Sequence, residues 1–160
     1  MTFRLGQTSK NNLVGVHPDL VRLVEYAITI SAVDFRVHEG IRSVLKQKEN
    51  IKAGVSWTMN SRHLTGHAVD LVPWRDSDGD GDCELSWDWE SCYRIAAAMQ
   101  IAARKYKTPV IWGGVWDKRL NDLSQSLESE TKNYAARRRR LGKQVKLDGP
   151  HFELDRSAYP

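Results

Sequence analysis

Two short segments of the chain carry side chains that could hold a metal ion. Residues 61–70 contain His63 and Asp70, and residues 148–153 contain His151. Two neutral imidazoles and a carboxylate are ligands that a catalytic zinc ion takes while its fourth position stays open. Such an ion lowers the pKa of a water molecule and polarises a carbonyl group. The two segments therefore predict metal-assisted hydrolysis.

Two further carboxylates in the second segment suit this chemistry. Asp148 stands three residues before His151, where it could act as general base and then donate a proton to a leaving amine. In an extended strand Glu153 shares the face of His151, so its carboxylate could accept a hydrogen bond from an imidazole N–H. Isolated histidines are more often structural than ligating. A strand with one polar face nevertheless favours the metal site.

The elements that would position these residues follow from local periodicity. Residues 68–72 and 149–154 alternate like strands, and Pro73 is expected to end the first of them. Further strands are expected from residue 33 to an end at Gly40 and over residues 110–112. Helices are expected from Pro18, with an apolar stripe that runs to Ala27, and over residues 43–52 and about 88–105. Strands mixed with helices, without a βαβ rhythm, predict an α+β fold: a small antiparallel sheet flanked by helices, with the zinc site on the sheet face. A chain of 160 residues is expected to form a single catalytic domain over 1–160.

A polar segment at about 118–143 differs from the rest of the chain. It is nearly free of bulky apolar residues and predicts an exposed helical insertion outside the core. It ends in a basic run of Arg137, Arg138, Arg139 and Arg140. This run could contact anionic components of a bacterial envelope, or it could be a solvated helix face. Specific nucleic-acid binding is disfavoured because no aromatic side chains interleave with the arginines.

Residues 76–82 form an acidic, glycine-containing loop. Its carboxylates, which match the start of an EF-hand calcium loop, are Asp76, Asp78, Asp80 and Asp82. Position twelve of that pattern is Trp87 instead of glutamate, so weak calcium binding and a solvated turn both remain open. The two cysteines, Cys83 and Cys92, lack metal-site spacing and are expected to be reduced thiols.

The combined motifs closely resemble a known family. Ser-x-His-x-x-Gly-x-Ala-x-Asp at 61–70 and Asp-Gly-Pro-His-Phe-Glu-Leu at 148–154 resemble the D-alanyl-D-alanine carboxypeptidase superfamily of zinc peptidases. Within it, the chain is most similar to phage endolysins that act as L-alanyl-D-glutamate endopeptidases. The stretch Gly-Ile-Arg-Ser at 40–43, the downstream Gln47 and the stretch Trp-Gly-Gly-Val-Trp at 112–116 extend the likeness.

The resemblance implies an LAS-type peptidase fold and a role for each matching residue. His63, Asp70 and His151 would bind zinc, and Asp148 would be the catalytic acid and base. Arg42 would orient the substrate or stabilise an oxyanion, since a guanidinium offers a fixed fork of donors. Gln47 and Ser61 would line the substrate site, and Glu153 would support an imidazole.

The function implied is hydrolysis of the L-Ala-D-Glu bond of the peptidoglycan stem peptide for host lysis. A D,D-carboxypeptidase or dipeptidase of the same superfamily, and a non-catalytic cell-wall-binding module, stay as alternatives. A module that only binds would not need Asp148. Residues 1–6 lack the apolar core of a signal peptide, so we expect a monomer made in the host cytoplasm and released onto the periplasmic wall.

Overall fold

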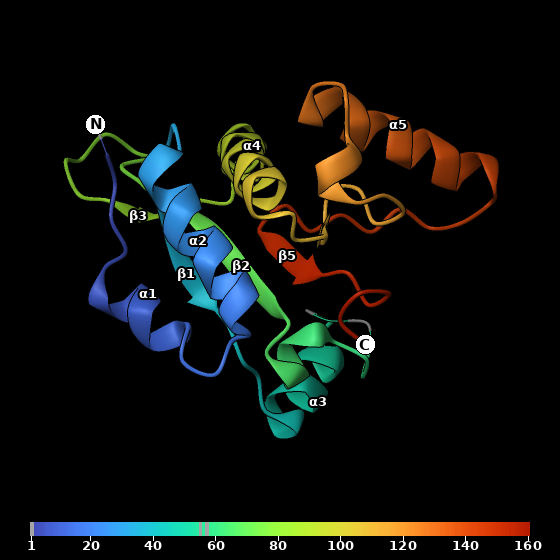
Figure 1. The fold of residues 1–160 in the computed structure, drawn as a ribbon, viewed down its shortest axis with the longest axis horizontal. Coiled ribbons are helices and arrows are strands. Elements are labelled where there is room, and N and C mark those ends of the chain that lie inside the picture. The colour runs from blue at the N-terminus through green and yellow to red at the C-terminus, as the bar shows by residue number, and fades with distance from the viewer. Residues whose placement is uncertain (1, 55, 57) are drawn as a thin grey trace.

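The computed structural model describes residues 2–54, 56 and 58–160, and at its centre is an antiparallel sheet (Figure 1). The four strands that cross the sheet lie in the order β1 (Phe35–Glu39), β2 (Ala68–Arg75), β5 (His151–Leu154) and β4 (Val110–Trp112). A short strand, β3 (Glu84–Leu85), pairs with the end of β2. Every pairing is antiparallel. The predicted α+β fold with a small antiparallel sheet is confirmed.

Helices flank this sheet. In chain order they are α1 (Gln7–Asn12), α2 (Pro18–Ile30), α3 (Val44–Lys52), α4 (Trp89–Tyr106) and α5 (Leu127–Arg140), with 3-10 helices η1 (Arg62–Thr65) and η2 (Leu120–Asp122). Side chains cap several starts: Ser43, Asp88 and Ser126 each accept a backbone N–H bond at α3, α4 and α5. Among the described residues, no helix is both long enough and apolar enough to span a bilayer.

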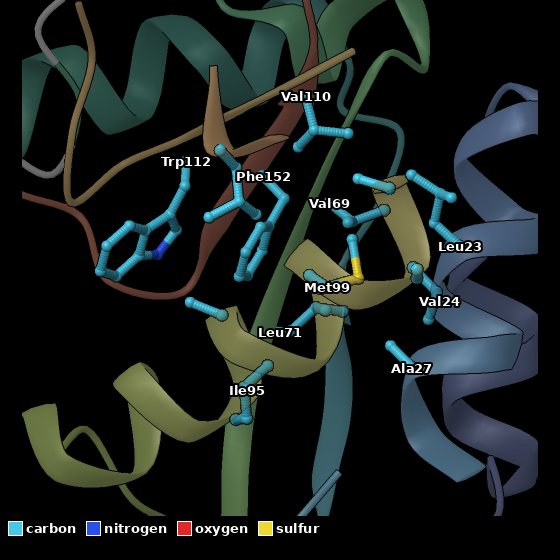
Figure 2. Close-up of a cluster of buried hydrophobic side chains, with 14 of the residues drawn as sticks. Leu23, Val24, Ala27, Val69, Leu71, Ile95, Met99, Val110, Trp112 and Phe152 are labelled. Carbon is cyan, nitrogen blue, oxygen red and sulfur yellow. The ribbon is translucent and has the colours of Figure 1, made fainter. Parts of the chain in front are cut away.

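The core lies between one face of the sheet and helices α2 and α4 (Figure 2). Its labelled side chains come from α2, α4 and three strands: Leu23, Val24, Ala27, Val69, Leu71, Ile95, Met99, Val110, Trp112 and Phe152. Strand residues alternate between faces, so when Val69 and Leu71 face the helices, Asp70 faces the other way. The polar face of β2 and β5 is thereby turned away from the apolar core.

Three local features differ from the sequence-based expectations. Strand β2 continues through Pro73 to Arg75, because Pro73 pairs with Phe35 and its carbonyl still accepts the Ser86 N–H at 2.8 Å. The six-residue α1 and the two-residue β3 were not predicted. Elements this short show too few periodic positions to be recognised.

The segment at 118–143 is helical, as expected, but it is not outside the core. Leu120 is fully buried, Leu123 and Leu127 are nearly so, and Tyr134 joins the same apolar cluster. The Gln100 amide on α4 donates to the carbonyls of Leu120 and Leu123 at 2.9 and 3.0 Å. A few buried apolar side chains from η2 and α5 thus dock this segment against the core.

Candidate active site

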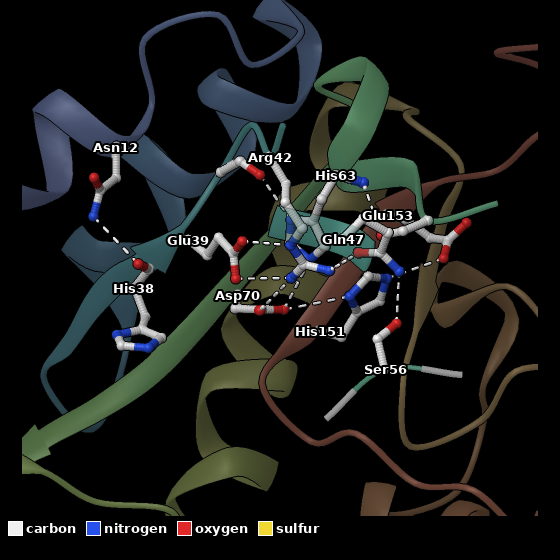
Figure 3. A network of polar contacts seen from close by, with 12 residues as sticks. Asn12, His38, Glu39, Arg42, Gln47, Ser56, His63, Asp70, His151 and Glu153 are labelled. Atoms are coloured by element: carbon white, nitrogen blue, oxygen red, sulfur yellow. Dashed lines mark hydrogen bonds and ion pairs between the residues drawn. The ribbon is translucent and has the colours of Figure 1, made fainter. Parts of the chain in front are cut away.

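His63, Asp70 and His151 meet on the polar face of the sheet (Figure 3). Asp70 and His151 are direct partners in the β2–β5 register, so their side chains share one face. His151 Nδ1 lies 3.3 Å from Asp70 Oδ1, and His63 Nε2 lies 3.2 Å from the same oxygen. Both imidazoles are buried, with exposed fractions of 2% for His63 and 6% for His151.

The local backbone explains how His63 reaches this point. It sits in η1, where the Ser61 hydroxyl accepts the His63 N–H at 3.3 Å. Gly66 ends this turn at φ +74, in the left-handed region, and a Cβ there would lie 2.5 Å from the Gly15 carbonyl. Glycine is therefore required where the chain leaves η1 for β2.

The outer nitrogen of each imidazole has its own acceptor. His63 Nδ1–H donates to the Gly40 carbonyl at 2.7 Å, and His151 Nε2–H donates to Glu153 at 3.0 Å. These bonds turn His63 Nε2 and His151 Nδ1 toward Asp70, and each of these nitrogens carries a lone pair for a metal when its imidazole is neutral. The contact expected between Glu153 and an imidazole is thus present.

These donor atoms could hold a zinc-sized cation. Zinc takes nitrogen and oxygen ligands at about 2.0–2.1 Å in a tetrahedron, which places neighbouring donor atoms about 3.3 Å apart. The two separations from Asp70 Oδ1, 3.2 and 3.3 Å, match that geometry, and all three donor atoms lie within 4.8 Å of one another. The set comprises two imidazole nitrogens and one carboxylate oxygen, which zinc accepts in proteins.

The charges of the histidine–aspartate cluster also favour a cation at this point. Burial by itself lowers the pKa of His151, but hydrogen bonds with Asp70 and Glu153 outweigh it and raise this pKa to about 10. Burial would raise the pKa of Asp70, yet hydrogen bonds from both imidazoles hold it below the usual range. Both shifts favour positive charge at the point where the three side chains meet.

Asp148 lies in the turn before β5 and lines the same groove as the three side chains. Its backbone N–H donates to the Gly113 carbonyl at 2.9 Å, and its carbonyl accepts the His151 N–H at 3.1 Å. A Cβ on Gly113 would lie 2.0 Å from that Asp148 carbonyl, so only glycine fits. Burial, and next the negative charge of Asp70, raise the pKa of Asp148, which suits a group that takes up and returns a proton.

Arg42 borders this cluster and is held in place from two sides. Its guanidinium donates to Glu39 at 2.5 and 2.7 Å and to the Gln47 Oε1 at 2.5 Å. Asp70 Oδ2 lies 4.0 Å from Arg42. The sequence analysis predicted a role for Arg42 but none for Glu39. A glutamate three residues before an arginine could have indicated this ion pair.

The structure places Gln47 behind Arg42, and any contact of Gln47 with substrate stays a prediction. Gln47 is fully buried behind Arg42, and its amide donates to the Ser56 hydroxyl at 2.7 Å and to the Thr58 carbonyl. Its polar atoms are thus used inside the protein. Ser61 does line the groove, so its contact with substrate stays a prediction.

The cluster lies in a groove of about 1090 Å³. Trp116, which the sequence did not assign, packs on His151 with ring centroids 5.1 Å apart. The basic run is divided: Arg137 pairs with Asp117 at 2.8 and 2.9 Å, whereas Arg138 lines the groove. The four arginines therefore do not form one uniform envelope-facing patch.

The acidic loop forms a second group of converging carboxylates, but with a different membership. Asp76, Asp78, Asp80 and Glu84 each offer one oxygen within 4.8 Å of the others, and Asp82 is not part of the group. Glu84 approaches because β3 pairs it with Arg75. Both cysteines are free, Cys83 at the surface and Cys92 buried, as expected for reduced thiols.

An α+β fold with a buried histidine–aspartate–histidine group beside a second acid, at the floor of a groove, is typical of metal-dependent hydrolases. The chain belongs to the phage L-alanyl-D-glutamate peptidase family, whose model matches residues 1–155. This confirms the resemblance on which the peptidase prediction rests.

Individual relatives agree with the family. An L-alanyl-D-glutamate peptidase of Escherichia phage T5 is 28% identical over 121 residues, which cover 73% of this chain and 84% of that protein. One of Listeria phage A118 is 29% identical over 86 residues, 54% of this chain but 27% of that protein. The crystal structure of the Serratia marcescens L-Ala D-Glu endopeptidase ChiX superposes with a TM-score of 0.72 at 38% identity, covering 99% of this chain and 95% of that one.

Proposed function

We propose that this peptidase is a zinc-dependent endolysin that hydrolyses the L-Ala-D-Glu bond of the peptidoglycan stem peptide. The observation that carries the proposal is the spacing of His63, Asp70 and His151, which fits tetrahedral zinc, next to the protonatable Asp148. The names of the family and its relatives support the choice of bond.

The metal ligands would be His63 Nε2, Asp70 Oδ1 and His151 Nδ1. When bound, zinc supplies a Lewis acid for the scissile carbonyl and increases the acidity of water. Glu153 fixes the orientation of the His151 ring through the 3.0 Å hydrogen bond. The Gly40 carbonyl does the same for His63.

Proton movement falls to Asp148. Its carboxylate takes a proton from the water that attacks the carbonyl carbon and passes it to the amide nitrogen as the C–N bond breaks. Arg42 presents N–H donors at the edge of the cluster, where they can stabilise the oxygen that becomes negative. Glu39 and Gln47 keep that guanidinium in one orientation.

Product analysis tests the bond assignment. Purified peptidoglycan is digested with the protein, and the fragments are identified by mass spectrometry. New N-terminal D-glutamate supports the proposal, whereas released D-alanine supports a D,D-carboxypeptidase or dipeptidase. Intact fragments together with wall binding would indicate a non-catalytic module. Elemental analysis of the same preparation should find one zinc ion per chain.

The site of action and the assembly state belong to the same proposal. The protein would be made in the host cytoplasm as a monomer and reach the periplasmic wall when the inner membrane is opened during lysis. Calcium binding at the acidic loop of Asp76, Asp78, Asp80 and Glu84 stays a prediction, and calorimetric titration with calcium would test it.

A further inference from the structure

One wall of the groove is built by the segment that contains α5 and the loop after it. Figure 1 shows α3 and α5 on opposite sides of β5, so the two walls come from distant parts of the chain. The lining residues of the α5 wall are Tyr134, Arg138, Lys143, Gln144, Lys146 and Leu147. Three of these six side chains are cationic, so this wall is strongly basic.

Arg138 is directed into this wall by its neighbours. Arg137 is fixed to Asp117 by two hydrogen bonds, and the next residue on a helix points about 100° away. Arg138 Nε donates to the Gln144 carbonyl at 2.9 Å, which uses one of its five N–H donors. In the described part of the chain, neither Arg138 nor Lys143 forms an ion pair with a carboxylate.

The basic wall is continuous with the cluster at the groove floor. The Trp116 ring packs on His151, and its Nε1–H donates to the Lys146 carbonyl at 2.8 Å. Lys146 is followed two residues later by Asp148. A substrate whose scissile bond lies at the cluster would therefore also contact the α5 wall.

Cations on the opposite wall are already occupied within the protein. Arg42 is paired with Glu39, and Arg62 donates to the backbone carbonyls of Leu154 and Tyr159. Arg156, which also lines the groove, donates to the Asn60 carbonyl and lies 4.0 Å from the Glu153 carboxylate. On the α5 wall, Arg138 and Lys143 therefore offer positive charge to an anionic substrate group. Guanidinium and ammonium groups in a partly desolvated groove bind carboxylates strongly.

The substrate class of the proposed function contains such a group. D-glutamate has two carboxyl groups, and when its amino group is acylated by alanine and one carboxyl continues the peptide, the other remains free. We propose that Arg138 and Lys143 bind this free carboxylate on the leaving-group side of the scissile bond. This inference rests on the proposed function and adds a specificity determinant to it.

A pair of substrates that differ only in this carboxylate tests the inference. N-acetylated stem tetrapeptide amides are prepared with lysine at the third position, one with D-glutamate and one with D-isoglutamine, in which the carboxylate is an amide. Values of kcat/KM are measured for wild type, Arg138→Gln and Lys143→Gln. Arg140→Gln is the matched control, because Arg140 belongs to the same run but is exposed and does not line the groove.

We expect each wall variant to lose about 10- to 100-fold in kcat/KM on the glutamate peptide, the range of a hydrogen bond to a charged group. On the isoglutamine peptide the loss should be less than threefold. Wild type should prefer the glutamate peptide, and Arg140→Gln should behave like wild type on both peptides. Lys143 is exposed, so Lys143→Gln should melt at the same temperature as wild type. This variant therefore tests the inference even if Arg138→Gln folds poorly.

Equal losses on the two peptides, or no loss on either, would overturn the inference while leaving the proposed function intact. A third peptide carries diaminopimelate, which has an additional carboxylate, in place of lysine at the third position. If Arg138→Gln and Lys143→Gln lose activity only on this peptide, the α5 wall binds the third residue and not D-glutamate, and the inference is wrong. If wild type cleaves none of the peptides between alanine and glutamate, the proposed function itself fails.

Discussion

The guanidinium of Arg42 and the carboxylate of Glu39 form a paired contact with N–O distances of 2.5 and 2.7 Å at the edge of the histidine–aspartate cluster. Gln47 holds a third guanidinium nitrogen from behind. A donor that is fixed before the substrate arrives stabilises developing charge without reorganisation. Glu39 is thus a positioning residue for Arg42.

Glu39→Gln should reduce kcat about tenfold, because it keeps a side chain of the same shape but removes the charge that orients Arg42. Arg42→Ala should cost about 100-fold or more, the range for losing an oxyanion donor. The double variant should be no worse than Arg42→Ala, since the two residues act as a unit. Steady-state kinetics on a stem peptide measure all three, and strictly additive losses would contradict the coupling.

Asp148→Asn should lower kcat by about 10²- to 10⁴-fold, the usual contribution of a general acid–base group. The amide has nearly the same shape, and it cannot accept and return the proton. Zinc content, measured by elemental analysis, should stay at the wild-type level. His151→Ala is the contrasting variant and should lose both zinc and activity. An active Asp148→Asn would rule out the assigned role.

Zinc should stabilise the folded chain, because its ligands come together only in the native state. At a free concentration 100 times the dissociation constant, binding adds about 2.7 kcal/mol. For a chain of this size that corresponds to a rise in Tm of roughly 5–11 °C. Scanning calorimetry with zinc and after chelation measures the shift.

The same titration tests the support of His151. Glu153→Gln should weaken zinc binding about 10- to 100-fold, since it removes the carboxylate that orients the ring. His63→Ala should show no zinc-dependent shift in Tm. A full wild-type response in His63→Ala would mean that zinc binds elsewhere.

Leu120→Ala should lower the free energy of unfolding by about 2–5 kcal/mol, as expected for a leucine deleted from a packed core. Leu120 is fully buried, although it lies in the polar segment at 118–143. Leu141→Ala is the matched control, since Leu141 is 68% exposed and should change stability by less than about 0.5 kcal/mol. Urea denaturation of both variants measures the difference, and similar effects would contradict the docking of α5.

The two cysteines should react at very different rates with a thiol reagent. Cys92 is buried, and burial raises the pKa of its thiol to about 12, so almost no thiolate is present at neutral pH. Cys83 is exposed. We expect one thiol per chain to react with Ellman's reagent in the native protein and two after denaturation. Two fast thiols in the native state would be inconsistent with the packing of Cys92.

Much of the site could be predicted because its chemistry is encoded locally. The residue types and short spacings of His63, Asp70, Asp148 and His151 indicated metal-assisted hydrolysis before any fold was known. Strand alternation alone placed Glu153 on the face of His151, and their hydrogen bond follows from that arrangement. The family resemblance added the substrate and the roles of Arg42, Gln47 and Ser61.

What the sequence by itself determined is therefore the set of reactive groups and the helices and strands that carry them, because caps and periodic patterns involve neighbours along the chain. Tertiary structure alone decided which imidazole nitrogens face Asp70, that Gln47 braces Arg42 from behind, and that Arg138 lines the groove. These relationships join residues from different elements. They exist only after the sheet pairs β2 with β5 and α5 docks against the core.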